Sequence, residues 1–321
     1  MSAQRPLVTA SALVAAVAIG AVIAVQPRVN GQLAVELDDG FLAAFISFAV
    51  GTAALGVALL VWAPGRRGFG RVRLALAGRR MSPWFLAGGL AGAFLVLSQG
   101  LTAAVLGVAL FTVALVGGQT LGSLLIDRIG VGTMAPKPFT VQRVAGALLA
   151  IVAVAWAVSD RLHGEVPWWM LVLPLLAGIG TGWQQAVNGQ VREFSGSVLT
   201  ASLVSFLGGT VALAIASGVH IAVAGPPEPF PSNPWLYTGG LLGVVFIAGS
   251  AALVRTTGVL LFGLAVIAGQ LSSAVLLDLI VPVSDAGVAF STIGGAVLAV
   301  VAVCIAALRP RQARHAGTPR A

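Results

Sequence analysis

Stretches of apolar residues alternate with short polar connections along the whole chain. A helix needs about 20 mostly apolar residues to cross the hydrocarbon core of a bilayer, which is about 30 Å thick. Membrane-spanning helices are therefore predicted at 7–29, 41–62, 84–100, 102–126, 142–158, 168–189, 197–223, 235–253, 258–281 and 288–308. The third and fourth stretches meet near Leu101, and their joint length of about 40 residues is too long for a single span.

The basic residues are distributed unevenly over the connections between these stretches. If the N-terminus is cytoplasmic, sixteen of the 18 Lys and Arg residues fall on the cytoplasmic side, and only Arg28 and Arg161 fall outside. Cytoplasmic loops of membrane proteins collect Lys and Arg. The count therefore predicts that both termini are cytoplasmic.

Rare polar residues recur at fixed spacings in the two halves of the chain. At an offset of 158, Gln26, Asn30, Gly31 and Gln32 match Gln184, Asn188, Gly189 and Gln190, and Ser47-Phe48 with Gly51-Thr52 matches Ser205-Phe206 with Gly209-Thr210. At an offset of 151, Gly88-Gly89, Gly118-Gln119 and Asp127 match Gly239-Gly240, Gly269-Gln270 and Asp278. Two unrelated apolar helices would not place amides and carboxylates in step, so the chain contains an internal repeat.

The two repeats are predicted to have opposite orientations in the membrane, because each contains five helices, an odd number. The connection 65–80 carries six arginines, whereas its counterpart 225–234 has no Lys or Arg and contains Glu228 and five prolines. The predicted fold is an all-α polytopic membrane protein with about ten transmembrane helices. Residues 1–160 and 161–321 are its two inverted five-helix repeats, which form one transmembrane domain. This architecture is common in secondary transporters, whose substrate sites lie between the repeats.

Composition agrees with a membrane protein and excludes several other classes. The chain is 58% hydrophobic and only 9% charged, against about 25% charged residues in a soluble domain. The net charge of +8 comes from loop residues without interleaved aromatics, so we expect no nucleic-acid partner. The single cysteine, Cys304, and the three scattered histidines offer no metal-ligand spacing.

The repeated Q-x-x-x-N-G-Q block, followed in each half by S-F-x-x-G-T, is similar to sequences of a known family. Five-helix inverted halves with these motifs resemble YdcZ-type members of the drug/metabolite transporter (DMT) superfamily, in the form that fuses two halves. The resemblance spans about residues 7–308 and implies a ten-helix DMT-like bundle. It also implies a transporter that moves a small solute or metabolite across the bacterial inner membrane.

One feature of the superfamily is missing from this sequence. Small multidrug-resistance relatives use a glutamate in the first helix of each half, but 7–29 and 168–189 contain no acidic residue. A glutamate-based exchange of protons against cations is therefore not carried over to this chain.

The repeated amides are the main candidates for the transport path. Gln26 and Asn30 are four residues apart and share one helix face, as do Gln184 and Asn188. An unpaired amide is costly in hydrocarbon, so these side chains either bond neighbouring helices or line a polar path. With the topology above, the first pair lies toward the outside and the second toward the cytoplasm.

Gln119 and Gln270 fall near the middle of their predicted helices, at the depth where repeat-interface sites lie. We expect them to line the path between the two amide pairs. Asp127 and Asp278 fall near helix ends and are weaker candidates for proton coupling. For Asp127, an ion pair with the adjacent Arg128 is the simpler account, while Ser47 and Ser205 are expected to bond their own helix backbones.

No catalytic motif is present: the sequence lacks a Walker loop, an HExxH motif and a nucleophile elbow. We therefore expect no enzyme activity, no catalytic residue and no cofactor. The leading interpretation is a secondary transporter that works by alternating access. The alternative is a membrane partner or assembly subunit that does not itself transport. The expected partners are a small-molecule solute and membrane lipid, and the chain is expected to be a monomer or homodimer.

Overall fold

A computed structural model describes residues 4–132, 136, 138–161, 167–282 and 287–307. In this part of the chain the secondary structure is helical, and nine helices are long and apolar enough to cross a membrane. The predicted all-α membrane fold is confirmed. The extreme termini, for which the sequence predicts a cytoplasmic location, and Lys137, His163 and His315 lie outside the described residues.

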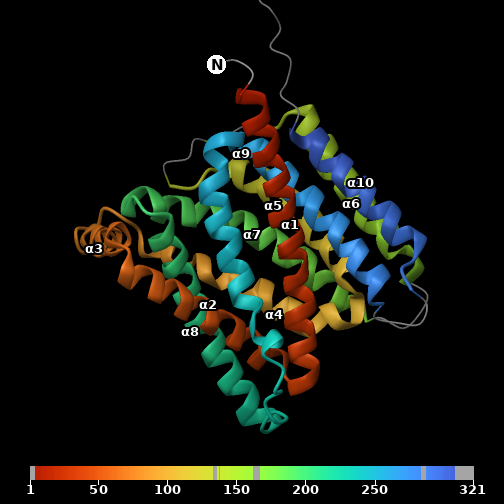
Figure 1. The fold of residues 1–321 in the computed structure, drawn as a ribbon, viewed down its shortest axis with the longest axis horizontal. Helices are drawn as coiled ribbons and strands as arrows, with labels where there is room; N and C mark the ends of the chain where they lie inside the picture. Colours follow the sequence, from red (N-terminus) through yellow and green to blue (C-terminus); the bar gives the residue numbers. More distant parts are fainter. Residues whose placement is uncertain (1–3, 133–135, 137, 162–166, 283–286, 308–321) are drawn as a thin grey trace, which may run out of the picture.

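The helices follow the predicted order (Figure 1). The first half contains α1 (Gln4–Leu37), α2 (Gly40–Val61), α3 (Ala63–Ala77), the 3-10 turn η1 (Pro83–Ala87), α4 (Gly88–Leu106), α5 (Val108–Ile129) and α6 (Val141–Val158). After the turn η2 (Ser159–Arg161), the second half contains α7 (Trp168–Ser195), α8 (Val198–Ala224), η3 (Pro234–Tyr237), α9 (Gly239–Ile280) and α10 (Phe290–Ala307).

The border between the third and fourth spans differs between sequence and structure. The hydrophobic pattern places it near Leu101, but α4 continues to Leu106, and Gly107 separates it from α5. Gly107 has φ = 81°, a left-handed conformation that a residue with a Cβ rarely adopts. A hydropathy pattern shows where apolar residues lie. It does not show where a glycine with a positive φ angle ends a helix.

The corresponding pair of spans in the second half forms one element. The predicted spans 235–253 and 258–281 are both contained in α9, a helix of 42 residues. Figure 1 shows that α9 runs up beside α1 and then turns back downward, so its two arms take the places of two spans. Their described apolar portions are Gly239–Gly249 and Phe262–Ile280.

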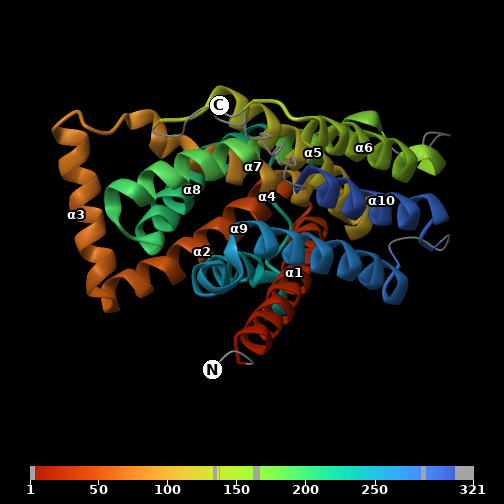
Figure 2. The same cartoon turned by 90° about the horizontal axis from the view of Figure 1, so that it is seen from above.

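The arginine-rich connection after the second span, expected only as a loop, contains helix α3. Its buried positions Gly65, Gly68, Val72 and Ala75 fall on one face, which gives the helix an amphipathic pattern. Figures 1 and 2 show α3 at the edge of the molecule, end-on in the view in which α1 is seen lengthwise. Its axis is therefore steeply inclined to that of α1.

The first helix of each half packs on the third and fourth spans of the other half. A Cβ on Gly20 of α1 would collide with the carbonyl of Val266 on α9, and one on Gly269 would collide with the carbonyl of Val17. Gly178 of α7 and Gly118 of α5 meet in the same way, through the carbonyls of Leu115 and Leu175. Glycine permits this backbone contact, which is the main way in which helices gain packing energy in lipid.

Repeat partners touch each other at the centre of the molecule. The hydroxyls of Thr52 and Thr210 lie 2.7 Å apart, and the rings of Phe48 and Phe206 stack with centroids 4.9 Å apart. Equivalent residues of two repeats contact one another only near the axis that relates them. The pseudo-two-fold axis that relates the two repeats therefore passes between α2 and α8.

Helices α6 and α10 form the remaining cross-repeat pair. Gly146 faces the carbonyl of Ala302 and the side chain of Ala306, and Gly295 faces the carbonyl of Ala153 and the side chain of Ala157. These reciprocal contacts make Ala157 and Ala306 equivalent positions. The helices pack as an antiparallel pair at one side of the bundle (Figure 2).

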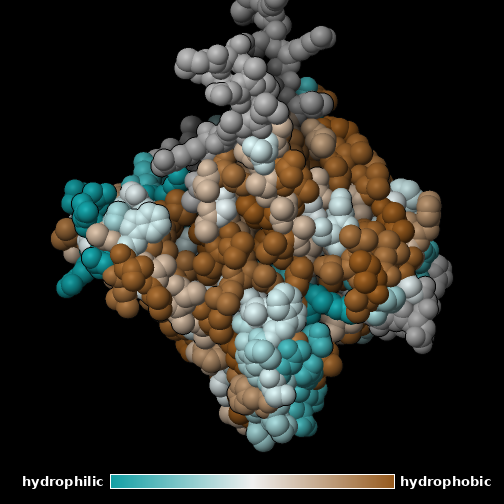
Figure 3. Space-filling view, in the orientation of Figure 1, coloured by the Kyte–Doolittle hydropathy of each residue, from teal (hydrophilic) through white to brown (hydrophobic). Residues whose placement is uncertain are grey.

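The surface agrees with a lipid environment. Figure 3 shows hydrophobic residues over most of the helical face, with hydrophilic residues gathered around α3 and at the opposite lower end of the molecule. The connection 225–234 lies against the end of α1, where the Glu228 amide donates to the carbonyl of Leu37 at 3.0 Å. Its counterpart α3 lies against the turn between α7 and α8, as the repeat requires.

The orientation in the membrane can be tested by cysteine labelling in a Cys304→Ala background. Ser232 and Gly70 are both exposed, and a side chain at Gly70 meets no neighbour, so single cysteines there should not disturb the fold. Because arginines mark the cytoplasmic side, an impermeant thiol reagent added outside should modify Ser232→Cys and leave Gly70→Cys unmodified. The opposite pattern would show that the orientation is reversed.

Candidate functional site

A cavity of about 760 Å³ lies between the two repeats. Its walls come from α1, α2, α4 and α5 in the first half and from α7, α8 and α9 in the second, with further residues from α6 and α10. Six of the eight predicted site residues line it: Gln26, Gln119, Asp127, Gln184, Asn188 and Gln270. A repeat-interface site is where secondary transporters bind their substrates.

The first amide pair is buried and fixed by the opposite helices. The amide nitrogen of Gln26 donates to the carbonyl of Gly239 at 3.0 Å, and that of Asn30 donates to Oε1 of Gln99 at 2.6 Å. Asn30 is fully buried behind the cavity wall, and its Oδ1 has no hydrogen-bond partner among the described residues. This end of the interface is closed by direct contacts.

The second amide pair is less deeply buried. Gln184 and Asn188 both donate to the hydroxyl of Ser205, at 3.2 and 3.3 Å, and both line the cavity. The hydroxyl of Ser47, the repeat partner of Ser205, has no hydrogen-bond partner among the described residues, although Ser47 also lines the cavity. The two amide pairs are therefore equivalent in sequence but differ in environment.

Gln119 and Gln270 line the cavity from α5 and α9. Both follow the glycines at which α1 and α7 make backbone contact with these helices. Gln270 is buried and Gln119 is partly buried, and the structure shows no hydrogen bond from either side chain to the described residues. Their donors and acceptors are available to a bound molecule or to water.

Asp127 forms an ion pair with Arg143, at the beginning of α6, rather than with Arg128 as the sequence suggested. The two side chains are 19% and 23% exposed and line the cavity together. Arg128 instead lies over the ring of Phe139, 5.6 Å from its centroid. Among the described residues that line the cavity, only Asp127 and Arg143 carry full charges, and these oppose each other.

Asp278 occupies a different environment from its repeat partner. It is buried, and its carboxylate accepts hydrogen bonds from the backbone amides of Val108 at 3.0 Å and Ala109 at 2.7 Å. These amides begin α5, directly after the break at Gly107, and Gly107 itself cannot supply a capping side chain. Asp278 therefore caps a helix of the other repeat, where its negative charge also suits the helix dipole.

Several lining residues were missed by sequence reasoning. Gln99 was overlooked because candidates were chosen by repetition, and its counterpart at offset 151 is Ser250. Ser205 was expected to bond its own helix, but it accepts bonds from two amides of α7. Arg143 was read only as an orientation signal. Its closeness to Asp127, 16 residues earlier, depends on the fold of the α5–α6 connection.

Comparison with known families identifies the chain. The model of a family described as "Putative inner membrane exporter, YdcZ" matches residues 11–156 and again residues 168–305. The chain belongs to the YdcZ family. It is a multi-pass membrane protein of a transporter family, and each of its two halves matches the family model separately.

A solved structure described only as "Crystal structure of protein" has a similar fold. It shares 18% sequence identity with this YdcZ-family chain at a TM-score of 0.53, and the alignment covers 93% of this chain and 96% of the other. At that identity the likeness concerns the fold alone. The comparison with curated proteins found no match.

The cap formed by Asp278 leads to a prediction about stability. Asp278→Ala leaves two buried backbone amides without an acceptor, which should destabilise the protein by about 2 kcal/mol, the usual cost of losing hydrogen bonds to a charged group. Asp278→Asn keeps one acceptor oxygen and should cost less. The thermal unfolding midpoint of the purified protein measures both effects.

Asp127→Ala is the matched comparison, because Asp127 is the repeat partner and is partly exposed to the cavity. It should lower the midpoint less than Asp278→Ala does. Equal losses for the two alanine variants would contradict the assignment of the cap to Asp278.

Proposed function

We propose that this YdcZ-family protein exports a small polar solute from the cytoplasm by alternating access, with the cavity between the repeats as its binding site. The family description supports export in general, and the cavity supplies a site at the repeat interface. The orientation predicted from the basic residues puts Asp127 and Arg143 at the cytoplasmic end of this cavity. The described conformation then faces the cytoplasm.

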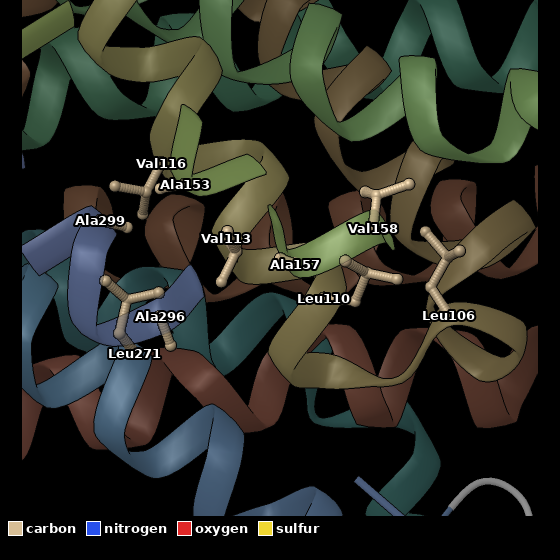
Figure 4. Close-up of a cluster of buried hydrophobic side chains, with 10 residues drawn as sticks. All are labelled: Leu106, Leu110, Val113, Val116, Ala153, Ala157, Val158, Leu271, Ala296 and Ala299. Atoms are coloured by element: carbon tan, nitrogen blue, oxygen red, sulfur yellow. The ribbon is translucent and has the colours of Figure 1, made fainter. Parts of the chain in front are cut away.

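The observation that carries the proposal is the unequal burial of equivalent residues. A buried hydrophobic cluster seals the interface on the other side of the cavity, among α4, α5, α6, α9 and α10 (Figure 4). Its members include Val113, Val116, Ala157, Val158 and Leu271. Their repeat partners line the cavity: Leu264, Ile267, Ala306, Ala307 and Thr120, of which Ile267 also packs against the cluster. The cluster members Ala153, Ala296 and Ala299 have buried repeat partners, Ala302, Ala147 and Ala150, so the inequality concerns part of the cluster.

This inequality gives alternating access a physical basis. The two halves have related sequences. Each half can therefore adopt the arrangement in which these positions are buried and the arrangement in which they line the cavity. If the halves exchange arrangements, Ala157 becomes exposed to the outer side and Ala306 becomes buried. The two amide pairs would exchange environments in the same way. In the described conformation Gln26 and Asn30 are buried, and Gln184 and Asn188 are less deeply buried.

The chemistry of the cavity limits the solute. Its wall combines amides and hydroxyls with phenyl rings from Phe48, Phe206, Phe246 and Phe262, and its one ion pair leaves no net charge. Such a wall binds by hydrogen bonds and apolar contact. The proposed solute is neutral or zwitterionic, or a cation held by carbonyl oxygens and aromatic rings. Its size is limited by the volume of about 760 Å³.

Cysteine accessibility at the equivalent positions Ala157 and Ala306 tests alternating access. In a Cys304→Ala background, Ala306→Cys should react with an impermeant reagent applied from the cytoplasmic side. Ala157→Cys should react slowly from outside at rest, because Ala157 is fully buried. A transported solute applied from the cytoplasmic side should speed the reaction at Ala157→Cys and slow it at Ala306→Cys.

A cysteine at Ser232, exposed on the connection that the predicted orientation places outside, is the matched control. Its labelling should not respond to solute. If no solute in a broad panel of metabolites is transported in proteoliposomes, and none alters the labelling rate of Ala157→Cys or Ala306→Cys, the alternative of a non-transporting membrane partner is the better account.

The central glutamines should be required for transport. Replacing Gln119 or Gln270 by Leu removes the free amide groups that face the cavity, while leucine remains well suited to a helix in lipid. Each variant should lose most solute flux in proteoliposomes, with its thermal midpoint close to that of the parent. Substantial flux in the double variant would show that the solute binds elsewhere.

A further inference from the structure

Helix α3 has the position and flanking residues of a segment at the membrane surface. Trp62 directly precedes it and is 60% exposed, and Trp84 follows it in η1 and is 64% exposed. Exposed tryptophans are characteristic of the headgroup level, where their rings are apolar and their N–H groups remain hydrated. Helix α3 is steeply inclined to α1 (Figures 1 and 2), and its 15 residues are not among the candidate membrane spans, so it lies along this level.

The charged side chains on α3 and its flanks are all positive. Residues 62–84 contain six arginines and no acidic residue. Arg66 donates to the carbonyl of Leu60, and Arg71 donates to the carbonyl of Ser195 at 3.4 Å. The side chains of Arg67, Arg73 and Arg80 are exposed, and no hydrogen bond or ion pair joins their guanidinium groups to the described part of the chain.

The repeat counterpart of α3 carries no comparable charge. The counterpart connection, 225–234, occupies the equivalent place at the α1–α2 turn without any basic residue. The arginines are also accompanied by exposed apolar side chains, Phe69 at 42% and Leu74 at 66%. A cationic helix with exposed apolar residues at headgroup level is complementary to anionic lipid.

The buried face of α3 is fastened to the turn between α7 and α8. The hydroxyl of Thr200 donates to the carbonyl of Gly65 at 2.9 Å, and a Cβ on Gly68 would crowd Thr200 and Ser197. Arg71 reaches the last turn of α7 at Ser195. Helix α7 is the element that carries Gln184 and Asn188, so α3 connects the membrane surface to one of the two amide pairs.

We propose that α3 binds the headgroups of anionic phospholipids and thereby holds the α7–α8 turn in the position that keeps the cavity open. Headgroup phosphates contact Arg67, Arg73 and Arg80, and the apolar side chains of Phe69 and Leu74 enter the upper acyl region. Loss of the anionic lipid frees the turn and favours closure around Gln184 and Asn188. This second step rests on the proposed transport function, whereas the lipid contact does not.

Lipid binding is tested on the purified full-length protein in neutral detergent. Phosphatidylglycerol should raise the thermal midpoint by several degrees, and phosphatidylcholine or soluble glycerol 3-phosphate should not. The triple variant Arg67→Gln, Arg73→Gln, Arg80→Gln should lose most of this rise. The matched triple lysine variant retains the charge and should keep it.

Three results would overturn the lipid contact. They are an undiminished rise in the glutamine variant, an equal rise with glycerol 3-phosphate, which would indicate a free phosphate site, and an equal rise with a short oligonucleotide, which would indicate a general polyanion site. None of these measurements depends on transport, so failure here is distinct from failure of the proposed function.

The coupling to the cavity is tested by the labelling rate of Ser202→Cys in a Cys304→Ala background, because Ser202 lines the cavity from α8. In nanodiscs, adding phosphatidylglycerol to phosphatidylcholine should speed labelling several-fold. The glutamine variant should label slowly in both lipids, and the lysine variant should behave like the parent. If the labelling rate of Ser202→Cys in the protein with its arginines intact does not depend on lipid, the coupling is overturned, even where lipid raises the thermal midpoint.

Discussion

Helix α1 and the second arm of α9 meet backbone to backbone where Gly20 faces the carbonyl of Val266, and α7 and α5 meet in the same way at Gly178. In lipid there is little hydrophobic gain in bringing two apolar helices together, so close packing has to supply the attraction. These two contacts join the halves, and similar glycine contacts occur within the first half, where Gly100 faces the carbonyl of Gly40. The first helix of each half therefore packs against a helix of the other half, and the two repeats form a single unit.

The placement of the polar residues follows from these contacts. Gln119 and Gln270 come directly after the contact glycines Gly118 and Gly269, and so are carried to the repeat interface. Polar groups that faced lipid would lose their hydrogen bonds at a cost of several kcal/mol each. The interface between the halves provides partners, as the Gln26–Gly239 bond shows. The same packing that joins the repeats thus concentrates amides around one cavity.

Sequence reasoning recovered the repeated features well, because repetition distinguishes meaningful polar residues from incidental ones in an apolar chain. The all-α membrane fold, the two repeats and six cavity-lining residues were predicted in this way. Features present in only one half were missed: the break at Gly107 without a matching break in α9, helix α3, Gln99 and the role of Arg143. Their signals are a backbone angle, a short amphipathic face and contacts between distant residues, none of which hydropathy or repetition records.

These unmatched features also bear on the proposed direction of transport. A perfectly symmetric pair of inverted repeats would have no preference between its two arrangements, because the two-fold axis would make their free energies equal. Here the counterpart of Arg143 is Thr292, and the counterpart of the cationic α3 is the proline-rich connection 225–234.

Asp127 and Asp278 show the same difference in their contacts. One aspartate is paired with an arginine in the cavity, and the other is buried as the cap of α5. Both the ion pair and α3 lie on the side that the predicted orientation assigns to the cytoplasm. In the proposed transport cycle we therefore expect them to set the free-energy difference between the two arrangements.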